Sequence, residues 1–269
     1  MTQDDSPRKP LDPQGSKYKG IAGLYESLLR RFKRLMHALT LLPLYAIAAL
    51  CLGISAAPGV AVFSWINEAF ATSTPFIRYG AIGIGIASAF FAFGFTLIFV
   101  APLLNFVLRT SPRPFRGPYY SVDFLRWYIH NGLTYLVRYT ILDFITPTPF
   151  NLMFYRMMGM KIGKDAQINS SNISDPALIE LGDRATIGGS ATIVAHYGVG
   201  GFLVISPVKI GAGATLGLRA IVMGGVEIGE NAKILPNSVV LPKTKIPAGE
   251  TWGGIPARKI ELRDLRTQD

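Results

Sequence analysis

The sequence contains little charge, and two long stretches contain none. Charged residues make up 16% of the 269-residue chain and apolar residues 49%, whereas soluble domains average about 25% charged residues. No Asp, Glu, Lys or Arg occurs at positions 38–67 or 79–108. Each run is longer than the roughly 20 residues that a helix needs to cross a bilayer, and longer than an ordinary helix of a soluble protein. The first run also starts too late for a cleaved signal peptide, so we expect a two-span transmembrane hairpin over residues 38–109.

Cysteine is almost absent, and basic residues outnumber acidic ones by 27 to 17. The single Cys51 lies in the first run, which excludes a disulfide framework or a cysteine metal site. The basic residues instead flank the two runs: Lys17, Lys19, Arg30, Arg31, Lys33 and Arg34 before them, and Arg109, Arg113 and Arg116 after them. By the positive-inside rule, both termini are cytoplasmic and the short connection is outside. We therefore attribute the net charge of +10 to membrane topology and contact with lipid, and expect no nucleic-acid partner.

The segments around the hairpin differ in character. Residues 1–16 are polar and contain proline, which predicts a disordered tail, and 17–37 predict a basic interfacial helix. Residues 118–158 predict amphipathic interfacial helices, because polar residues recur there every four positions: Arg126, His130, Thr134 and Arg138. His130 is then either a solvated histidine at the headgroup level or part of a polar stripe that receives an anionic acceptor.

Beyond residue 159 aliphatic residues recur every six positions, a period that fits neither a helix nor a strand. They are Ile162 and Ile168, then Leu181, Ile187 and Ile193, then Ile210, Leu216, Val222, Ile228, Ile234, Val240 and Ile246. Such a period predicts a solenoid, in which each triangular coil of eighteen residues stacks three aliphatic residues on those of its neighbours. We therefore expect a parallel β-helix over 159–260, followed by a tail over 261–269. The period breaks twice, which predicts a small bulge around Asp175 and a flexible loop that leaves the solenoid at His196.

The repeats carry a family resemblance. The stretches "IGKDAQI", "LGDRATIGGSATIVAH", "VKIGAGATLGLRAIVMGGVEIGENAKILPNSVVL" and "WGGIPARKI" resemble the hexapeptide-repeat acyltransferases, which are left-handed parallel β-helices. Among subgroups they are most similar to polysaccharide O-acetyltransferases and to the C-terminal transferase-like region of poly-amino-acid synthetases. The resemblance implies acyl transfer from coenzyme A in a homotrimer, with donor and acceptor meeting in the cleft between two prisms. It implies acetyl-CoA or another acyl-CoA as co-substrate, and we expect no metal.

The resemblance also implies roles for particular residues. A histidine placed like His196 acts as general base, and Asp175 is our candidate for its orienting partner, with Glu180 and Asp183 as weaker candidates. The implied coenzyme A contacts are Gly217, Leu218 and Pro236 along the pantetheine chain, and Lys243, Lys245, Arg258 and Lys259 at the phosphates. Leu218 and Pro236 replace the small residues usual there, so the groove is narrower or differently shaped. The alternatives are an exposed histidine at a loop exit, an aspartate that only sets a turn, and basic residues that only face lipid.

Together these features predict an enzyme of the bacterial inner membrane with its catalytic domain in the cytoplasm. It would transfer an acetyl group from coenzyme A to a hydroxyl of a membrane-associated acceptor, such as a lipid-linked saccharide. The alternatives are an N-acyltransferase, a lipid- or peptide-modifying acyltransferase of the same fold, and a non-enzymatic trimeric membrane scaffold. A carbonic anhydrase of the same β-helix class needs three metal-binding histidines, whereas His196 is the only histidine in the repeats.

Overall fold

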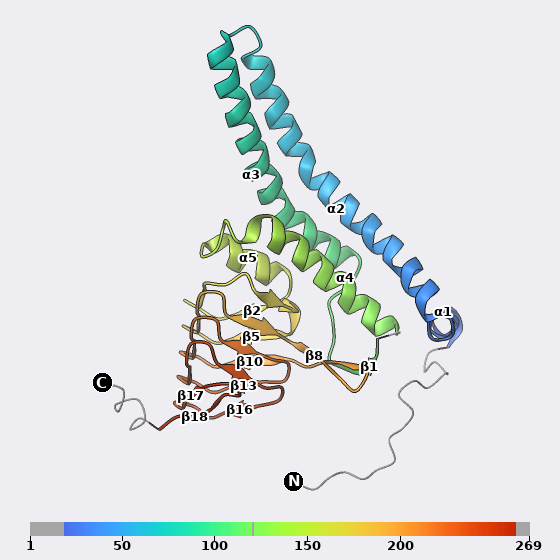
Figure 1. Ribbon diagram of the computed structural model, residues 1–269, viewed down its shortest axis with the longest axis vertical. Helices are drawn as coiled ribbons and strands as arrows, with labels where there is room; N and C mark the ends of the chain where they lie inside the picture. The colour runs from blue at the N-terminus through green and yellow to red at the C-terminus, as the bar shows by residue number, and fades with distance from the viewer. Residues whose placement is uncertain (1–18, 120, 262–269) are drawn as a thin grey trace.

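In the computed structural model, a long helical hairpin projects from a β-helix, and two shorter helices lie between them (Figure 1). The structure describes residues 19–119 and 121–261. The predicted tail over 1–16 and all but the first residue of the tail over 261–269 lie outside this part. A first helix, α1 (Gly20–Arg31), precedes the hairpin. The long helix α2 begins at Lys33, inside the interfacial helix that the sequence predicts over 17–37.

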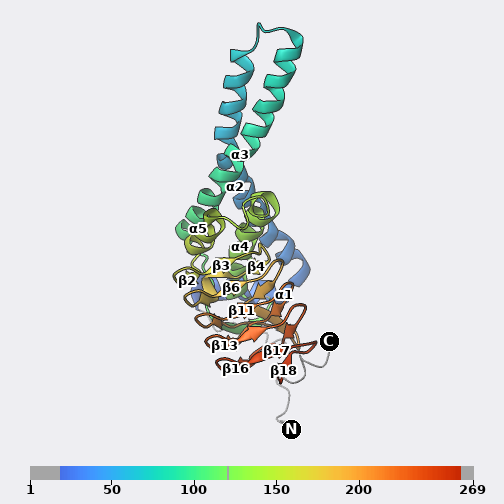
Figure 2. The same cartoon turned by 90° about the vertical axis from the view of Figure 1, so that its left-hand side faces the viewer.

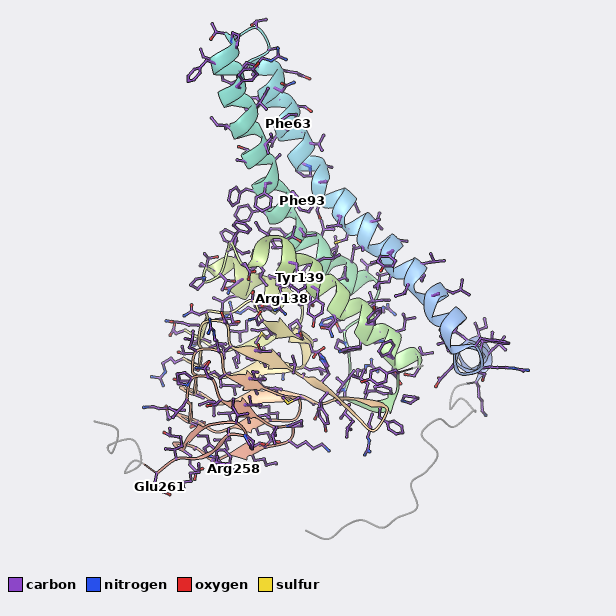
Figure 3. The ribbon with its side chains drawn as sticks, in the orientation of Figure 1. Phe63, Phe93, Arg138, Tyr139, Arg258 and Glu261 are labelled. Atoms are coloured by element: carbon purple, nitrogen blue, oxygen red, sulfur yellow. The ribbon has the colours of Figure 1, made fainter. Side chains whose placement is uncertain are left out.

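The hairpin consists of α2 (Lys33–Ala69) and α3 (Pro75–Val107). The helices run side by side and extend well beyond the rest of the molecule (Figures 1 and 2). Small residues allow their close contact: a Cβ at Gly59 would lie 2.6 Å from the carbonyl oxygen of Ala89, and one at Gly85 would lie 3.2 Å from Phe63 (Figure 3). Leu41–Ala69 and Pro75–Val107 are long and apolar enough to cross a membrane.

The two shorter helices connect the hairpin to the β-helix. Helix α4 (Val122–Val137) starts at Ser121, whose hydroxyl accepts the N–H of Phe124 at 3.2 Å as an N-cap. It continues into a π-helical turn, η1 (Arg138–Leu142), and is followed by α5 (Pro149–Met157). Phe154 and Tyr155 of α5 are fully buried in the same apolar cluster as the first β-helix coil. The amphipathic helices thus cover the end of the β-helix that faces the hairpin (Figure 1).

The β-helix has three parallel sheets. The first sheet contains β2 (Lys161–Ile162), β5 (Ile179–Leu181), β10 (Val208–Ile210), β13 (Glu227–Ile228) and β16 (Lys245–Ile246). The second contains β3 (Gln167–Ile168), β6 (Thr186–Ile187), β11 (Thr215–Leu216), β14 (Lys233–Ile234) and β17 (Thr251–Gly253), with the antiparallel strand β18 (Arg258–Lys259) at its edge. The third contains β4 (Ile173–Ser174), β7 (Thr192–Val194), β12 (Ile221–Val222) and β15 (Val239–Val240).

The strand register confirms the six-residue pattern. In the first sheet Ile162 pairs with Leu181, Leu181 with Ile210, and Ile210 with Ile228. The other two sheets stack their aliphatic residues in the same way, and most of these side chains are buried. The predicted parallel β-helix is therefore correct.

Both breaks in the pattern form ordered structure. Around the first, Asp175 adopts a left-handed backbone (φ 61°) before the 3₁₀ turn η2 (Pro176–Leu178). At the second, the chain leaves the prism as a β-hairpin of β8 (His196–Val199) and β9 (Phe202–Ile205). Its turn contains Gly200 and Gly201, both with positive φ, as a tight hairpin turn requires. The segment after α3 adds a third strand, β1 (Phe115–Pro118), antiparallel to β9. The chain thus leaves the prism at His196, as predicted, and forms a hairpin that pairs with β1.

Close stacking of the coils leads to a prediction about Gly188. A Cβ at this position would lie 2.6 Å from the carbonyl oxygen of Leu216, whereas one at the next residue, Gly189, would meet only the end of the Leu218 side chain, at 3.1 Å. We expect Gly188→Ala to lower the free energy of unfolding by about 1–3 kcal/mol, since overpacking moves backbone atoms. Gly189→Ala is the matched control, and thermal unfolding followed by circular dichroism compares them. Equal melting temperatures for the two variants would contradict the prediction.

Candidate active site

His196 and Asp175 meet at the corner where the third sheet turns into the first. The chain passes from β7 through Ala195 to His196, and Asp175 follows β4 in the coil above. The imidazole Nδ1 lies 2.6 Å from the Asp175 carboxylate oxygen Oδ2. The aspartate side chain is fully buried, while the histidine side chain is 23% exposed. The bulge and the loop exit, separated by 20 residues of sequence, thus place an imidazole against a buried carboxylate.

The Asp175 carboxylate is surrounded by donors. Its Oδ1 accepts hydrogen bonds from the indole Nε1 of Trp127 at 2.6 Å and from the amide Nδ2 of Asn131 at 2.9 Å. Its Oδ2 accepts the backbone N–H of Ala195 at 3.0 Å and faces the Nδ1 of His196. These hydrogen bonds offset the cost of burying a charge, and they leave no position for a proton on the carboxylate. The Nδ1 of His196 is therefore the donor to Asp175, and in the neutral imidazole the lone pair is then on Nε2.

The opposite nitrogen of His196 is available for chemistry. Within the described residues no hydrogen-bond partner of Nε2 is found. The Trp127 ring lies edge-on to the imidazole, with ring centroids 4.9 Å apart and an interplanar angle of 68°. This packing limits rotation of the imidazole, so the site presents one proton acceptor in one orientation.

The sequence reasoning missed Trp127 and Asn131, which α4 brings to the site. They lie four residues apart and so share one helix face, which continues to Tyr135, whose hydroxyl lies 3.0 Å from Ser174 Oγ. This face is displaced by one residue from the predicted polar stripe, which contains Arg126, His130, Thr134 and Arg138. An indole and an amide at this spacing were a detectable signal, but nothing in the sequence shows that the face docks on a carboxylate 44 residues away.

The predicted polar stripe does not form one exposed face. His130 and Thr134 are fully buried, and the Nδ1 of His130 lies 2.8 Å from the Asn105 side-chain oxygen on α3. Burial lowers the pKa of His130 to about 4, although the Asp175 charge acts in the opposite direction. His130 is therefore neutral near pH 7, and both the solvated histidine and the acceptor-binding histidine are wrong. Arg138, which is labelled in Figure 3, donates instead to the Asn172 side chain.

The weaker alternatives to Asp175 lie elsewhere. Glu180 forms an exposed ion pair with Lys161 at 3.3 Å. The Asp183 carboxylate accepts the backbone N–H of Lys164 at 2.8 Å. Neither carboxylate contacts His196, and Asp175 is the only one of the three that does.

The residues predicted to contact the pantetheine chain lie at a different corner of the prism from His196. Gly217 and Pro236 stack where the second sheet turns into the third, and a Cβ at Gly217 would lie 2.5 Å from the Pro236 nitrogen. Leu218, at the same corner, is 51% exposed. A strand of the third sheet, β12, separates this corner from Gly224, which lies under the backbone of His196. Within one chain, the third sheet therefore separates the predicted donor groove from the histidine.

The four predicted basic residues lie at separate places on the β-helix. Lys243 packs under Gly225 at the corner of His196. Arg258 pairs with Gly253 below the corner of Pro236, at the far end of the β-helix from the hairpin (Figure 3). Lys259 forms an ion pair with Glu250 at 2.7 Å, which raises the pKa of the lysine. Lys245 pairs with Glu227 on the first sheet. Lys259 and Lys245 thus have protein partners, and Lys243 and Arg258 form no ion pair among residues 19–119 and 121–261.

Comparison with known proteins identifies the repeat. Residues 207–242 match the family described as "Bacterial transferase hexapeptide (six repeats)". Residues in the same register occur on both sides of this segment, from Ile162 to Ile246. The resemblance drawn from the sequence is therefore confirmed.

Three relatives show how the similarity is distributed. A delta-poly-L-ornithine synthetase of Acinetobacter baumannii is 25% identical over 185 residues, which are 67% of this chain and 14% of that protein. Gamma carbonic anhydrase 2 of Arabidopsis thaliana is 38% identical over 92 residues, 34% of this chain and 29% of that protein. A Bacillus subtilis protein named "Putative acetyltransferase YvoF" is 27% identical over 154 residues, 51% of this chain and 85% of that protein. The chain thus spans less than a third of the length of the first two.

Among solved structures, a hexapeptide-repeat acetyltransferase of Vibrio cholerae, complexed with acetyl-coenzyme A, is 18% identical. The match covers 57% of this chain and 96% of that structure's chain, with a TM-score of 0.42.

In the described part of this chain, no group of three or more His, Cys, Asp or Glu side chains is arranged to hold a metal ion.

Proposed function

We propose that this protein transfers an acetyl group from coenzyme A to a hydroxyl of a membrane-associated acceptor, with His196 as general base. The observation that carries the proposal is the contact of 2.6 Å between His196 Nδ1 and the buried carboxylate of Asp175. A carboxylate that holds one imidazole nitrogen protonated leaves the other to accept a proton, as in other acyl-transfer sites. The hexapeptide match and the relative named as an acetyltransferase support the same reaction.

The proposed reaction follows from this geometry. The oxygen of the acceptor hydroxyl forms a bond to the thioester carbonyl carbon, while His196 Nε2 takes the hydroxyl proton. Asp175 stabilises the imidazolium that results. When the tetrahedral intermediate collapses, the carbon–sulfur bond breaks and the imidazolium returns the proton to the departing thiolate. The products are an acetyl ester and free coenzyme A, and the histidine ends in its starting state.

The separation of the two corners supports a site shared between subunits. Because the third sheet separates the groove residues Gly217 and Pro236 from His196 in one chain, the groove of one copy would lie against the histidine of another. A cyclic trimer of left-handed prisms places two different corners together at every interface. Mass photometry of the purified protein in detergent is expected to show a trimer. A stable monomer with full activity would contradict the shared site.

The exposed apolar side chains of the hairpin support the proposed membrane anchoring. Its helices project from the body (Figures 1 and 2), and Trp65, Tyr79 and Ile84 expose 70%, 72% and 65% of their surface. A core helix of a soluble protein would bury such side chains. We therefore propose a hairpin that spans the bacterial inner membrane, with both termini and the β-helix in the cytoplasm, where coenzyme A is found.

The proposal is tested with labelled donor. Purified full-length protein is incubated with labelled acetyl-CoA and a bacterial lipid and glycan extract, and the labelled product is identified by mass spectrometry. We expect an alkali-labile acetyl ester on a lipid-linked saccharide or a similar amphiphile. No transfer from any acyl-CoA tested would contradict the proposed function.

An amine acceptor is the second candidate. One relative is named delta-poly-L-ornithine synthetase, and ornithine is a diamino acid, which supports this candidate. Hydroxylamine treatment of the labelled product distinguishes the two, because it cleaves the ester and leaves the amide.

A further inference from the structure

A second polar site lies where α3 ends and the chain turns back towards α4. A pocket of about 780 Å³ opens there. Three arginines line it: Arg109 just after α3, Arg113 in the following turn, and Arg126 on α4. No carboxylate lines this pocket, and none of the three arginines forms an ion pair with a residue of the described chain. The pocket therefore concentrates positive charge that the described residues do not compensate.

The backbone holds two of the arginines in place. Arg113 lies between Pro112 and Pro114, which restricts its backbone to extended conformations. Arg109 occupies the left-handed position that ends α3, with φ 53°. The N–H groups of Thr110 and Arg109 close this end by hydrogen bonds of 3.1 Å to the carbonyls of Asn105 and Phe106. Glycine is the usual residue at this position, so Arg109→Gly removes the side chain without straining the backbone.

Buried polar groups fix the floor of the pocket. The side-chain oxygen of Asn105 lies 2.8 Å from both Thr110 Oγ1 and His130 Nδ1, and both act as donors to it. The amide nitrogen of Asn105 consequently points to Ser111 Oγ at 3.3 Å, and both residues line the pocket. The pocket is therefore built before any ligand arrives.

We infer that this arginine pocket binds the phosphate group of a membrane lipid. Guanidinium groups match phosphate oxygens in charge and in planar, bidentate geometry. The pocket lies at the end of a helix long enough to span a bilayer, and Phe106, which also lines it, is 78% exposed. A phosphate held by the arginines would leave its hydrocarbon chain beside α3. The inference depends on the proposed membrane span and does not depend on acyl transfer.

This placement bears on the acceptor. Arg126 lines the pocket, and Trp127, the next residue of α4, donates to the Asp175 carboxylate. One helix thus connects the phosphate site with the histidine site. The phosphate can belong to a structural phospholipid or to the lipid carrier of the acceptor, and both present the same group.

Binding is measured on full-length protein that has been freed of lipid in detergent. The probes are short-chain phosphatidic acid, a polyprenyl phosphate, inorganic phosphate, and diacylglycerol as the probe without phosphate. The variants are Arg109→Gly and the double variant Arg113→Gln, Arg126→Gln. The matched control is Arg116→Gln, because Arg116 lies over the Phe202 ring at 5.8 Å and does not line the pocket. The same probes are applied to His196→Ala, which separates lipid binding from activity.

We expect the phosphate-bearing lipids to bind the wild type and the control equally. Arg109→Gly is expected to weaken binding about tenfold, the loss of one charged hydrogen-bonding group, without lowering the melting temperature, because glycine suits its backbone. Tighter binding of the polyprenyl phosphate would identify the acceptor carrier, and tighter binding of phosphatidic acid would identify a structural lipid. The inference is overturned if diacylglycerol binds as well as phosphatidic acid, if only inorganic phosphate binds, or if the double variant retains wild-type affinity.

Discussion

Replacing His196 by alanine is expected to reduce acetyl transfer by about 10²–10⁴-fold, the usual contribution of a general base. The residual rate would come from binding of donor and acceptor, which the substitution leaves intact. The loss should appear mainly in kcat. Steady-state kinetics with labelled acetyl-CoA measures it, and the melting temperature should change little because the side chain is partly exposed.

The control and a rescue experiment separate chemistry from structure. Tyr197→Phe alters the next residue of the same strand and is expected to leave the rate near the wild-type value. Removal of the His196 ring leaves a space between Trp127 and the Asp175 carboxylate, into which free imidazole can enter. We expect added imidazole to restore part of the rate of His196→Ala. Full activity of the unrescued variant would contradict the assignment of His196 as base.

Replacing Asp175 by asparagine is expected to lower acetyl transfer by about 10²–10⁴-fold, although Asp175 touches no substrate. Both carboxylate oxygens accept two donors each. An amide can present only one oxygen, so its NH₂ group must face either Trp127 and Asn131, or Ala195 and His196. The first arrangement weakens the support of the site from α4, and the second favours the wrong tautomer of His196.

The stability of Asp175→Asn should fall as well, by about 1–3 kcal/mol for buried donors left without an acceptor. Asp183→Asn is the matched control, because Asp183 accepts only one backbone N–H, from Lys164, and lies away from His196. If Asp175 acted only in folding, activity per folded molecule would be unchanged. A variant that keeps wild-type kcat at a temperature where it is fully folded would overturn its role as a positioning residue.

The six-residue repeats of the β-helix show what a local sequence pattern can predict. Each aliphatic residue from Ile162 to Ile246 stacks on the residue one coil away, because a coil of constant length places equivalent positions above one another. The same reasoning located the two breaks, and the bulge and the loop exit hold Asp175 and His196. Their spacing alone did not show that they touch. A histidine base needs an orienting partner, and the bulge one coil earlier made Asp175 the candidate; the contact of 2.6 Å agrees with that choice.

Helix α4 illustrates the opposite case. The sequence indicated an amphipathic helix but not which of two adjacent faces meets the β-helix, and a shift of one residue separates His130 from Asn131. Both faces carry polar residues, so the pattern did not distinguish them. The packing of α4 against its neighbours shows which face is which. Trp127 and Asn131 form hydrogen bonds with Asp175 of the β-helix, while His130 forms one with Asn105 of the hairpin.

The sequence by itself thus determined the repeat fold and the two apolar helices, because these depend on regular spacing and on residues close together in the chain. It offered His196 as the catalytic candidate only through the family resemblance. Tertiary structure alone decided which donors surround Asp175, that the predicted donor groove and His196 occupy different corners, and that three arginines share one pocket. The reason is physical. These features arise where segments of different periodicity pack together, and such contacts depend on the relative placement of α3, α4 and the β-helix, which no local pattern encodes.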